Sequence, residues 1–166
     1  MYNPRLVFVT LFSTVAANSL GIARGAIDAF IELAARESST RSTDVLRDRP
    51  FVQARLAEAE AILNAARAYV VDAVGTFWEA VCNDAPDPSI AIAQARLAIV
   101  HAMHEAVRSV DLVFHAAGTN AIYCRNPLER YFRDIHVAVQ HNSAFPAQYE
   151  SAGKVLMGLR PADVGW

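Results

Sequence analysis

Apolar residues recur at steps of three and four along most of the chain, which is the period of an α-helix. The longest such run contains eight residues: Leu56, Ala59, Leu63, Ala66, Val70, Ala73, Phe77 and Ala80. A seam of this kind is typical of a helix in a bundle. No segment alternates apolar and polar residues for long, so the sequence does not predict a β-sheet.

Helix starts are predicted where a capping side chain precedes a proline. The side-chain oxygen can accept a hydrogen bond from a free backbone amide, and proline has no amide hydrogen to satisfy. Three such pairs predict the starts of the second, third and fourth helices: Asp48 with Pro50, Asp87 with Pro88, and Asn126 with Pro127. A shorter fifth helix is expected after Pro146. The sequence therefore predicts one all-α domain over residues 1–166, an up-down bundle of four long helices with a short terminal helix.

The first helix is expected over about residues 5–36. It has no charged residue between Arg5 and Arg24. A basic residue followed by an apolar run is also the way in which a secretory signal peptide begins. Side chains such as Thr10 and Asn18 make the segment too polar for a membrane span, and the helical period continues past Arg24. We therefore expect one long, mostly buried helix, with no signal peptide and no membrane anchor.

The composition indicates a protein with a partner. Of the 166 residues, 54% are hydrophobic and 19% are charged, which is more apolar surface than a solitary domain of this size needs to bury. We expect self-association, as a dimer or a tetramer. The net charge of -2, without a basic stripe, makes nucleic acid a poor partner. Cys82 and Cys124 have no paired spacing, which favours a reducing, cytoplasmic location.

Five polar residues recur at steps of three and four along the third predicted helix: His101, His104, Arg108, Asp111 and His115. This polar strip either faces a site or is a solvated or subunit-contacting face. The second interpretation is favoured, because charged residues and histidines on one helical face are common in bundles. A di-iron site would need Glu-x-x-His pairs, whereas the order here is His-x-x-His-Glu with no matching second motif. We therefore expect no metal.

Several segments together resemble a known family. They are the small-residue turn 116–123, the cap Asn126-Pro127, the tract Arg133-Asp134-x-His136, and residues 20–30 and 46–57. In this order they are similar to the carboxy-terminal helical domain of the acyl-CoA dehydrogenase superfamily. Within it the chain most resembles the branch of two-component flavin-dependent monooxygenases.

The resemblance implies a function for the complete enzyme. It would take reduced flavin, FAD or FMN, from a separate flavin reductase and use oxygen to hydroxylate an aromatic or similar small organic substrate. Family members place an amino-terminal helical domain and a middle β-domain before this bundle, and we expect both to be missing from this chain. The flavin would be shared with those domains or with a neighbouring subunit, so the chain alone is expected to be inactive. Two alternatives stay open: a fragment of an acyl-CoA dehydrogenase, and a non-catalytic helical oligomerisation module.

By the same resemblance, three residues are expected to contact the flavin. Arg41, in the polar connection after the first helix, would reach the flavin phosphate groups, since the guanidinium fork matches phosphate oxygens. A plain solvated arginine is equally compatible with the sequence, and Arg36 or Arg47 could serve instead. Gly118 and Thr119 would offer backbone amides and a hydroxyl, although the turn here is less rich in glycine than that of the dehydrogenases.

The resemblance also singles out His141 as the candidate catalytic residue. Aligning Arg133-Asp134 with the Arg-Asp of the dehydrogenases places their catalytic Glu near Asn142 and the preceding residue on His141. An amide cannot remove a proton from an acyl-CoA, so dehydrogenation by that route is disfavoured. A histidine at the flavin edge would hold or donate a proton, or take one from a phenolic substrate. The alternative is that His141 caps the end of the fourth helix, and His136 is a second candidate.

Overall fold

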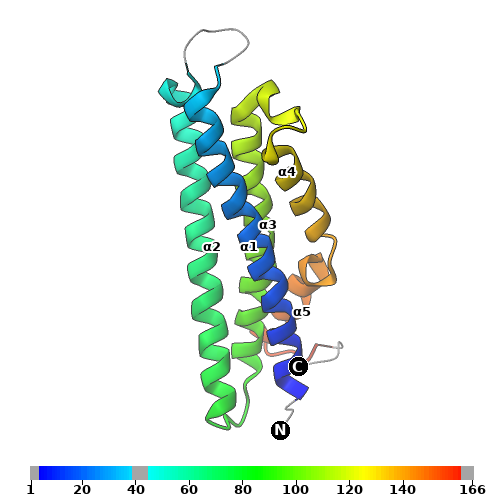
Figure 1. The fold of residues 1–166 in the computed structure, drawn as a ribbon. Coiled ribbons are helices and arrows are strands. Elements are labelled where there is room, and N and C mark those ends of the chain that lie inside the picture. The colour runs from blue at the N-terminus through cyan, green and yellow to red at the C-terminus, as the bar shows by residue number, and fades with distance from the viewer. Residues whose placement is uncertain (1–3, 39–44, 162–166) are drawn as a thin grey trace.

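The computed structural model describes residues 4–38 and 45–161, and this part of the chain is helical (Figure 1). It contains five α-helices: α1 (Pro4–Arg36), α2 (Pro50–Cys82), α3 (Ser89–Ala117), α4 (Pro127–Ala138) and α5 (Pro146–Leu156). Three short 3-10 helices join them: η1 (Leu46–Asp48), η2 (Gly118–Ile122) and η3 (Asn142–Ala144). Within the described residues there is no strand, and one isolated bridge pairs Ser38 with Val45. The predicted all-α bundle is confirmed.

The fourth helix of the bundle is shorter than predicted. Helices α1 and α2 have 33 residues each and α3 has 29, whereas α4 has 12 and α5 has 11. Figure 1 shows α4 and α5 following one another along the side of the three long helices. The expectation of four long helices is therefore wrong. The break lies between Ala138 and Pro146, where η3 intervenes and where proline lacks the amide hydrogen that a continuous helix would need.

Helix α3 lies at the centre of the bundle. It packs against α1, α2, α4 and α5, and its residues take part in all four buried apolar clusters of the described chain. Seven of its buried residues are alanines, whose small side chains let neighbouring helices approach closely: Ala93, Ala95, Ala98, Ala102, Ala106, Ala116 and Ala117. The largest cluster joins α1, α3 and α4 through residues such as Phe30, Val110 and Leu128.

The apolar seam predicted for α2 is confirmed. Its inner positions are buried at Ala59, Leu63, Ala66, Val70, Ala73 and Phe77. Leu56 and Ala80, at the two ends of the seam, are half-buried. The regular spacing therefore identified the face of α2 that meets the core.

Helix α1 is less buried than the sequence indicated. Its inner residues, including Ala23, Ile27 and Phe30, are fully buried, but Leu11 and Ile31 are exposed on its outer side. It is the one helix of the described residues that is long and apolar enough to cross a membrane by length and composition, and 28% of its most apolar window is buried. The expectation of a mostly buried helix is thus wrong for this chain by itself, because the other helices cover only one side of α1.

The start of α2 also differs from the prediction. Asp48 lies in η1, and Arg49 takes the capping position without a side-chain hydrogen bond. Arg49 has φ -91° and ψ 122°, the extended conformation that a following proline imposes on the residue before it. Pro50 begins the helix as expected, but Asp48 stands one residue too early to cap it.

The two later helix starts agree better with the prediction. Asn126 Oδ1 accepts a hydrogen bond from the Leu128 amide at 3.1 Å, so the predicted cap of α4 is confirmed. Asp87 Oδ1 accepts from the Ser89 amide at 3.0 Å, although α3 begins at Ser89, one residue later than predicted.

Candidate functional site

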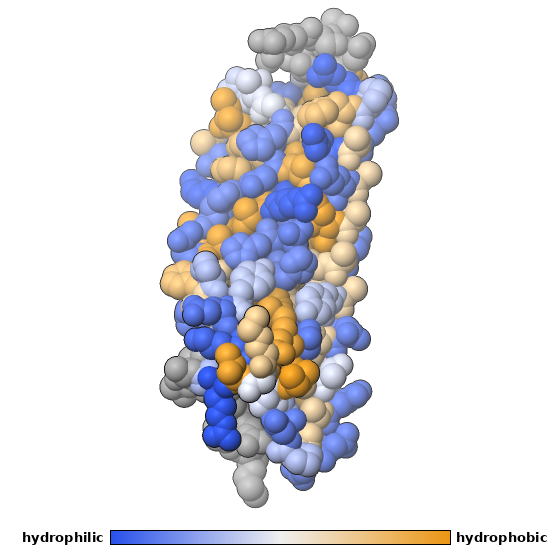
Figure 2. Space-filling view, turned by 180° about the vertical axis from the view of Figure 1, so that it is seen from behind, coloured by the Kyte–Doolittle hydropathy of each residue, from blue (hydrophilic) through white to orange (hydrophobic). Residues whose placement is uncertain are grey.

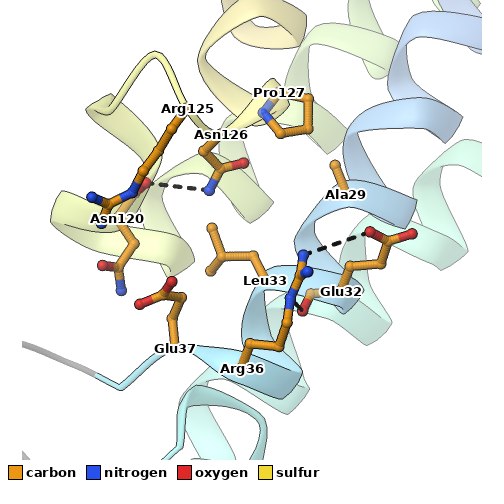
Figure 3. A pocket seen from close by; sticks show the side chains of 9 residues that line it. All are labelled: Ala29, Glu32, Leu33, Arg36, Glu37, Asn120, Arg125, Asn126 and Pro127. Atoms are coloured by element: carbon orange, nitrogen blue, oxygen red, sulfur yellow. Dashed lines mark hydrogen bonds and ion pairs between the residues drawn. The ribbon is translucent and has the colours of Figure 1, made fainter.

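A pocket of about 280 Å³ lies where the end of α1 meets the segment that joins α3 to α4. Figure 3 shows Glu32 and Arg36 on α1, with Asn120, Arg125 and Asn126 facing them across the pocket. We call this the end pocket. It is further lined by Ala29, Leu33, Glu37 and Pro127.

The charges around the end pocket balance. Arg36 and Arg125 contribute two positive charges, and Glu32 and Glu37 contribute two negative ones. Arg36 pairs with Glu32 at 3.7 Å (Figure 3), and the Arg125 guanidinium lies 4.8 Å from the centre of the Tyr123 ring. The pocket therefore offers amide and guanidinium donors, but this chain alone does not make it an electropositive site.

Two of the predicted flavin contacts, Gly118 and Thr119, directly precede the pocket residue Asn120 in η2, although neither lines the pocket itself. Gly118 ends α3 with φ 60° and ψ -140°, a backbone conformation that favours glycine. A Cβ at Gly118 would have nothing within 4 Å, so the backbone is open on that side. The Gly118 amide donates to the His115 carbonyl, which leaves the exposed Thr119 as the freer of the two groups toward a ligand.

The third predicted flavin contact, Arg41, lies outside the described residues. Ser38, which is described, lies close to Asn120, because the Asn120 side-chain amide donates to the Ser38 carbonyl at 3.1 Å. Of the two alternative arginines, Arg36 lines the end pocket, whereas Arg47 is not among the lining residues.

His141 directly precedes η3, at the far end of α4 from the end pocket. Its Nδ1 accepts a hydrogen bond from the Ser143 amide at 3.2 Å and lies 2.9 Å from Ser143 Oγ. Because a backbone N–H can only donate, Nδ1 must have a lone pair, and the proton of the neutral ring is on Nε2. The ring edge meets Phe12, with 5.9 Å between ring centres. His141 therefore caps η3, and the alternative that its side chain caps the end of the fourth helix is wrong.

The candidate residues thus form two groups. Gly118 and Thr119 lie at the amino-terminal end of α4, and His141 lies beyond its carboxy-terminal end. The 12 residues of α4 span about 18 Å along the helix axis. His141 is exposed and does not line the end pocket. A ligand that contacts both groups of candidate residues in one chain would therefore have to extend along the whole of α4. The described chain supplies walls for a ligand but does not enclose one.

The polar strip of α3 is a solvated, ion-paired face. Arg108 pairs with Glu58 of α2 at 3.3 Å and with Glu105 at 3.5 Å, and the His104 Nε2 lies 2.9 Å from the Ala144 carbonyl oxygen. Seen from behind, the middle of the bundle is covered largely by hydrophilic side chains (Figure 2). Among the described residues no group of three or more His, Cys, Asp or Glu could hold a metal ion.

One contact that the sequence did not predict joins Asp111 of the strip to His136 of α4, at 3.5 Å between Oδ1 and Nε2. Asp111 belongs to the polar strip and His136 to the Arg-Asp-x-His tract, which lie on different helices. Nothing in the sequence indicated that they meet, because the alignment of α4 along α3 depends on the packing of both helices.

Comparison with known proteins agrees with this geometry. The family model described as acyl-CoA dehydrogenase, C-terminal domain, matches residues 13–146. Indole-3-acetate monooxygenase of Pseudomonas putida is 33% identical over 158 residues, which are 95% of this chain and 40% of that protein. The oxygenase subunit HsaA, a flavin-dependent monooxygenase of Mycobacterium tuberculosis, is 29% identical over 153 residues, or 91% of this chain and 39% of that protein.

A solved structure shows the same arrangement of helices. The crystal structure of 3-HSA hydroxylase from Rhodococcus sp. RHA1 superposes with a TM-score of 0.84 and 27% identity, covering 95% of this chain and 41% of that one. The chain therefore spans about two fifths of the length of these relatives. On the family match, which covers most of its length, the chain belongs to the family of acyl-CoA dehydrogenase C-terminal domains.

Proposed function

We propose that this chain is the carboxy-terminal bundle of the oxygenase component of a two-component flavin-dependent monooxygenase. The observation that supports this most directly is the similarity to indole-3-acetate monooxygenase along 95% of the chain. A non-catalytic module would not need to keep the monooxygenase sequence pattern from the first helix to the loop after α4. The substrate class is an aromatic or similar small organic molecule.

The proposed reaction inserts one atom of O2 into the substrate, and the second atom leaves as water. Two electrons come from the reduced flavin, FAD or FMN, which a separate flavin reductase supplies. The bound flavin provides this oxygen chemistry. The protein surface of the bundle would bind the flavin, orient it and control protons beside it. Arg41 and Thr119 would face its phosphate groups, and the open backbone at Gly118 would allow close approach.

The residues of the chain fit such a group in part. The end pocket offers the side-chain amides of Asn120 and Asn126 and the guanidinium of Arg125, which can donate to phosphate or ribityl oxygens. Its two carboxylates and open walls mean that further donors must come from elsewhere. This supports a flavin shared with other domains or with a neighbouring subunit.

The proposed catalytic residue is His141. Its Nδ1 is fixed by the Ser143 amide, so Nε2 is the nitrogen that can exchange a proton with a substrate or with the flavin. The neighbouring Asn142 has no carboxylate with which to remove a proton from an acyl-CoA. The same loop thus disfavours the alternative of an acyl-CoA dehydrogenase fragment.

The test uses the full-length protein whose sequence contains this chain. Purified protein, a flavin reductase and NADH would be incubated with isotopically labelled O2 and a panel of phenols and aromatic acids. We expect mass spectrometry to find one labelled oxygen atom per product molecule. Reduction of an electron acceptor by an acyl-CoA, without labelled product from any aromatic compound, would contradict the proposal. A control without reductase should give no product.

A further inference from the structure

Asp111 of α3 and His136 of α4 face each other between the two helices, and they form an ion pair only if the His136 ring is protonated. His136 Nδ1 lies 2.8 Å from the carbonyl oxygen of Phe132, one helical turn earlier. Its other ring nitrogen, Nε2, lies 3.5 Å from Asp111 Oδ1. A carbonyl oxygen can only accept a hydrogen bond, so the hydrogen of a neutral His136 ring must be on Nδ1.

That assignment leaves Nε2 with a lone pair unless a further proton is bound. Asp111 Oδ1 is also an acceptor unless the carboxyl group is protonated. Without an additional proton, two lone pairs face each other across the gap. One proton on either atom turns the contact into an attraction, as an imidazolium–carboxylate pair or as a carboxyl group that donates to the ring. The contact between α3 and α4 is therefore favourable only in a protonated state.

Other cations do not replace this proton. Arg55 of α2 and Arg108 of α3 line the same pocket as Asp111. Each of them pairs with Glu58, at 2.8 Å and 3.3 Å, and Arg108 also pairs with Glu105 at 3.5 Å. Among the described residues Oδ1 of Asp111 has no hydrogen-bond partner and is shielded from solvent, although the side chain as a whole is 37% exposed.

Burial and the neighbouring charges act on the pKa of Asp111 in opposite directions. Burial raises the pKa of the Asp111 carboxyl, and the charges of His136 and of His115 lower it by less. The charged residues on the exposed side of α4 pair with one another: Arg130 with Asp134, and Arg133 with Glu129. A carboxyl group with a raised pKa favours the folded state most at low pH, and that contribution is lost as the pH rises through the raised pKa.

Aromatic rings fix the geometry of the pair. Phe132 stacks on Phe114 of α3 with 4.0 Å between ring centres, and the His136 ring lies 4.4 Å from that of Phe132. Turning the His136 ring to present a hydrogen to Asp111 would break its bond to the Phe132 carbonyl and disturb this stack. The ring is therefore held with Nε2 toward Asp111 in both protonation states.

We propose that the contact between Asp111 and His136 takes up one proton, held by either group, and that this proton is a pH-dependent tie between α3 and α4. The tie holds at low pH and is lost as the pH rises, when carboxylate and lone pair are left facing each other. It goes beyond the proposed oxygenase function, because it needs only the packing of the two helices. The tie would also restrict the motion of the segment that leads from α4 to His141.

The first test is the protonation of the His136 ring in the 166-residue chain, followed by nitrogen-15 NMR from about pH 5 to about pH 9. The His136 signals would be assigned by their loss in His136→Gln. We expect the neutral ring to carry its hydrogen on Nδ1, where it donates to the Phe132 carbonyl. A neutral ring with its hydrogen on Nε2 would overturn the proposal, since Nε2 could then donate to Asp111 without a further proton.

The second test measures the strength of the tie with Asp111→Asn. An asparagine amide can donate to the Nε2 lone pair at any pH, so this variant keeps the contact without the proton. Relative to Asp111→Asn, the unfolding equilibrium constant of the wild type should rise about threefold as the pH is raised from about 5 to about 9, the effect of losing one partly exposed ion pair. Asp134→Asn, a surface change on the same helix, should follow the wild type. Parallel pH profiles for the wild type and Asp111→Asn would overturn the proposal.

Discussion

Gly25 of α1 and Tyr131 of α4 are packed so closely that a Cβ on Gly25 would lie 2.8 Å from two ring carbons of Tyr131. The Tyr131 hydroxyl oxygen would be only 2.9 Å away. These distances are shorter than side chains tolerate, so the absence of a side chain at Gly25 is what allows the ring to lie against α1. The contact helps to place α4 along the bundle.

We expect Gly25→Ala and Gly21→Ala to have different effects on stability. Alanine in a helix interior is favoured over glycine by about 1 kcal/mol, and a Cβ on Gly21 would meet nothing within 4 Å, so Gly21→Ala should stabilise the fold by about that amount. In Gly25→Ala the Tyr131 ring must turn outward, and lost packing should cancel the gain or exceed it. Denaturant unfolding of both variants checks this.

A double substitution is the control for this contact. With Tyr131→Ala as the background, the ring is gone and both alanine substitutions should stabilise the fold alike. Equal effects of Gly21→Ala and Gly25→Ala in the presence of Tyr131 would show that the ring does not resist a side chain at Gly25.

The capping of α4 gives a second prediction. Asn126→Ala should lower the free energy of unfolding by about 1 kcal/mol, because the Leu128 amide loses its acceptor. Asn126→Asp keeps that acceptor but loses the 3.3 Å hydrogen bond to the Asn120 carbonyl, so it should cost less. Asp48→Ala, at the predicted cap that the structure does not use, should change stability by less than about 0.5 kcal/mol. A larger effect of Asp48→Ala than of Asn126→Ala would contradict the observed helix starts.

Part of the fold could be predicted from the sequence, and part depended on contacts between helices. Helical periods identified the buried face of α2, since that information is local to one helix. The choice between Asp48 and Arg49 at the start of α2 depended on a 3-10 turn that no periodic pattern indicates. The close packing at Gly25 was not predicted either, because a glycine inside a helical pattern does not show which ring will lie against it.

The third prediction separates two roles of His141 in the full-length protein. Asparagine is also a good capping residue, so His141→Asn should keep the hydrogen bond from the Ser143 amide and leave stability nearly unchanged. It cannot exchange a proton near neutral pH, so product formed per reduced flavin should fall about tenfold or more, and its dependence on pH should flatten. Product analysis against pH, with His101→Asn on α3 as control, makes the measurement.

The capping role is measured separately. His141→Ala removes both the proton and the cap, and it should also lower the free energy of unfolding by about 1 kcal/mol. Unchanged product yield and an unaltered pH profile in both His141 variants would leave this residue with a structural role alone.

Sequence patterns describe the candidate site only where it depends on a short stretch of the chain. The turn with Gly118 and Thr119 remains a predicted flavin contact, and in the structure it directly precedes Asn120, which lines the end pocket. Asp111 and His136 lie opposite each other on two different helices. Sequence patterns predict each of these helices separately. Only their packing sets which polar groups meet.

The fourth prediction concerns self-association. Several large apolar side chains are exposed on the outer surface of the long helices, including Leu11, Ile31, Val71 and Trp78. Val71 and Trp78 are seven residues apart on α2, and therefore lie on the same face. Sedimentation of the chain at micromolar concentration should show a species heavier than 18.1 kDa. Substituting lysine for both residues should weaken the assembly if this face is part of it, and a wild-type chain that sediments only at 18.1 kDa would refute the prediction.

The central position of α3 has a consequence for how the chain acquires its fold during synthesis. Each of the four apolar clusters includes residues of α3, which begins at Ser89, so the first half of the chain has no complete core of its own when it leaves the ribosome. Helices α1 and α2 can form only a loose hairpin until α3 emerges between them. Until then, their apolar faces are available to chaperones and to other nascent chains.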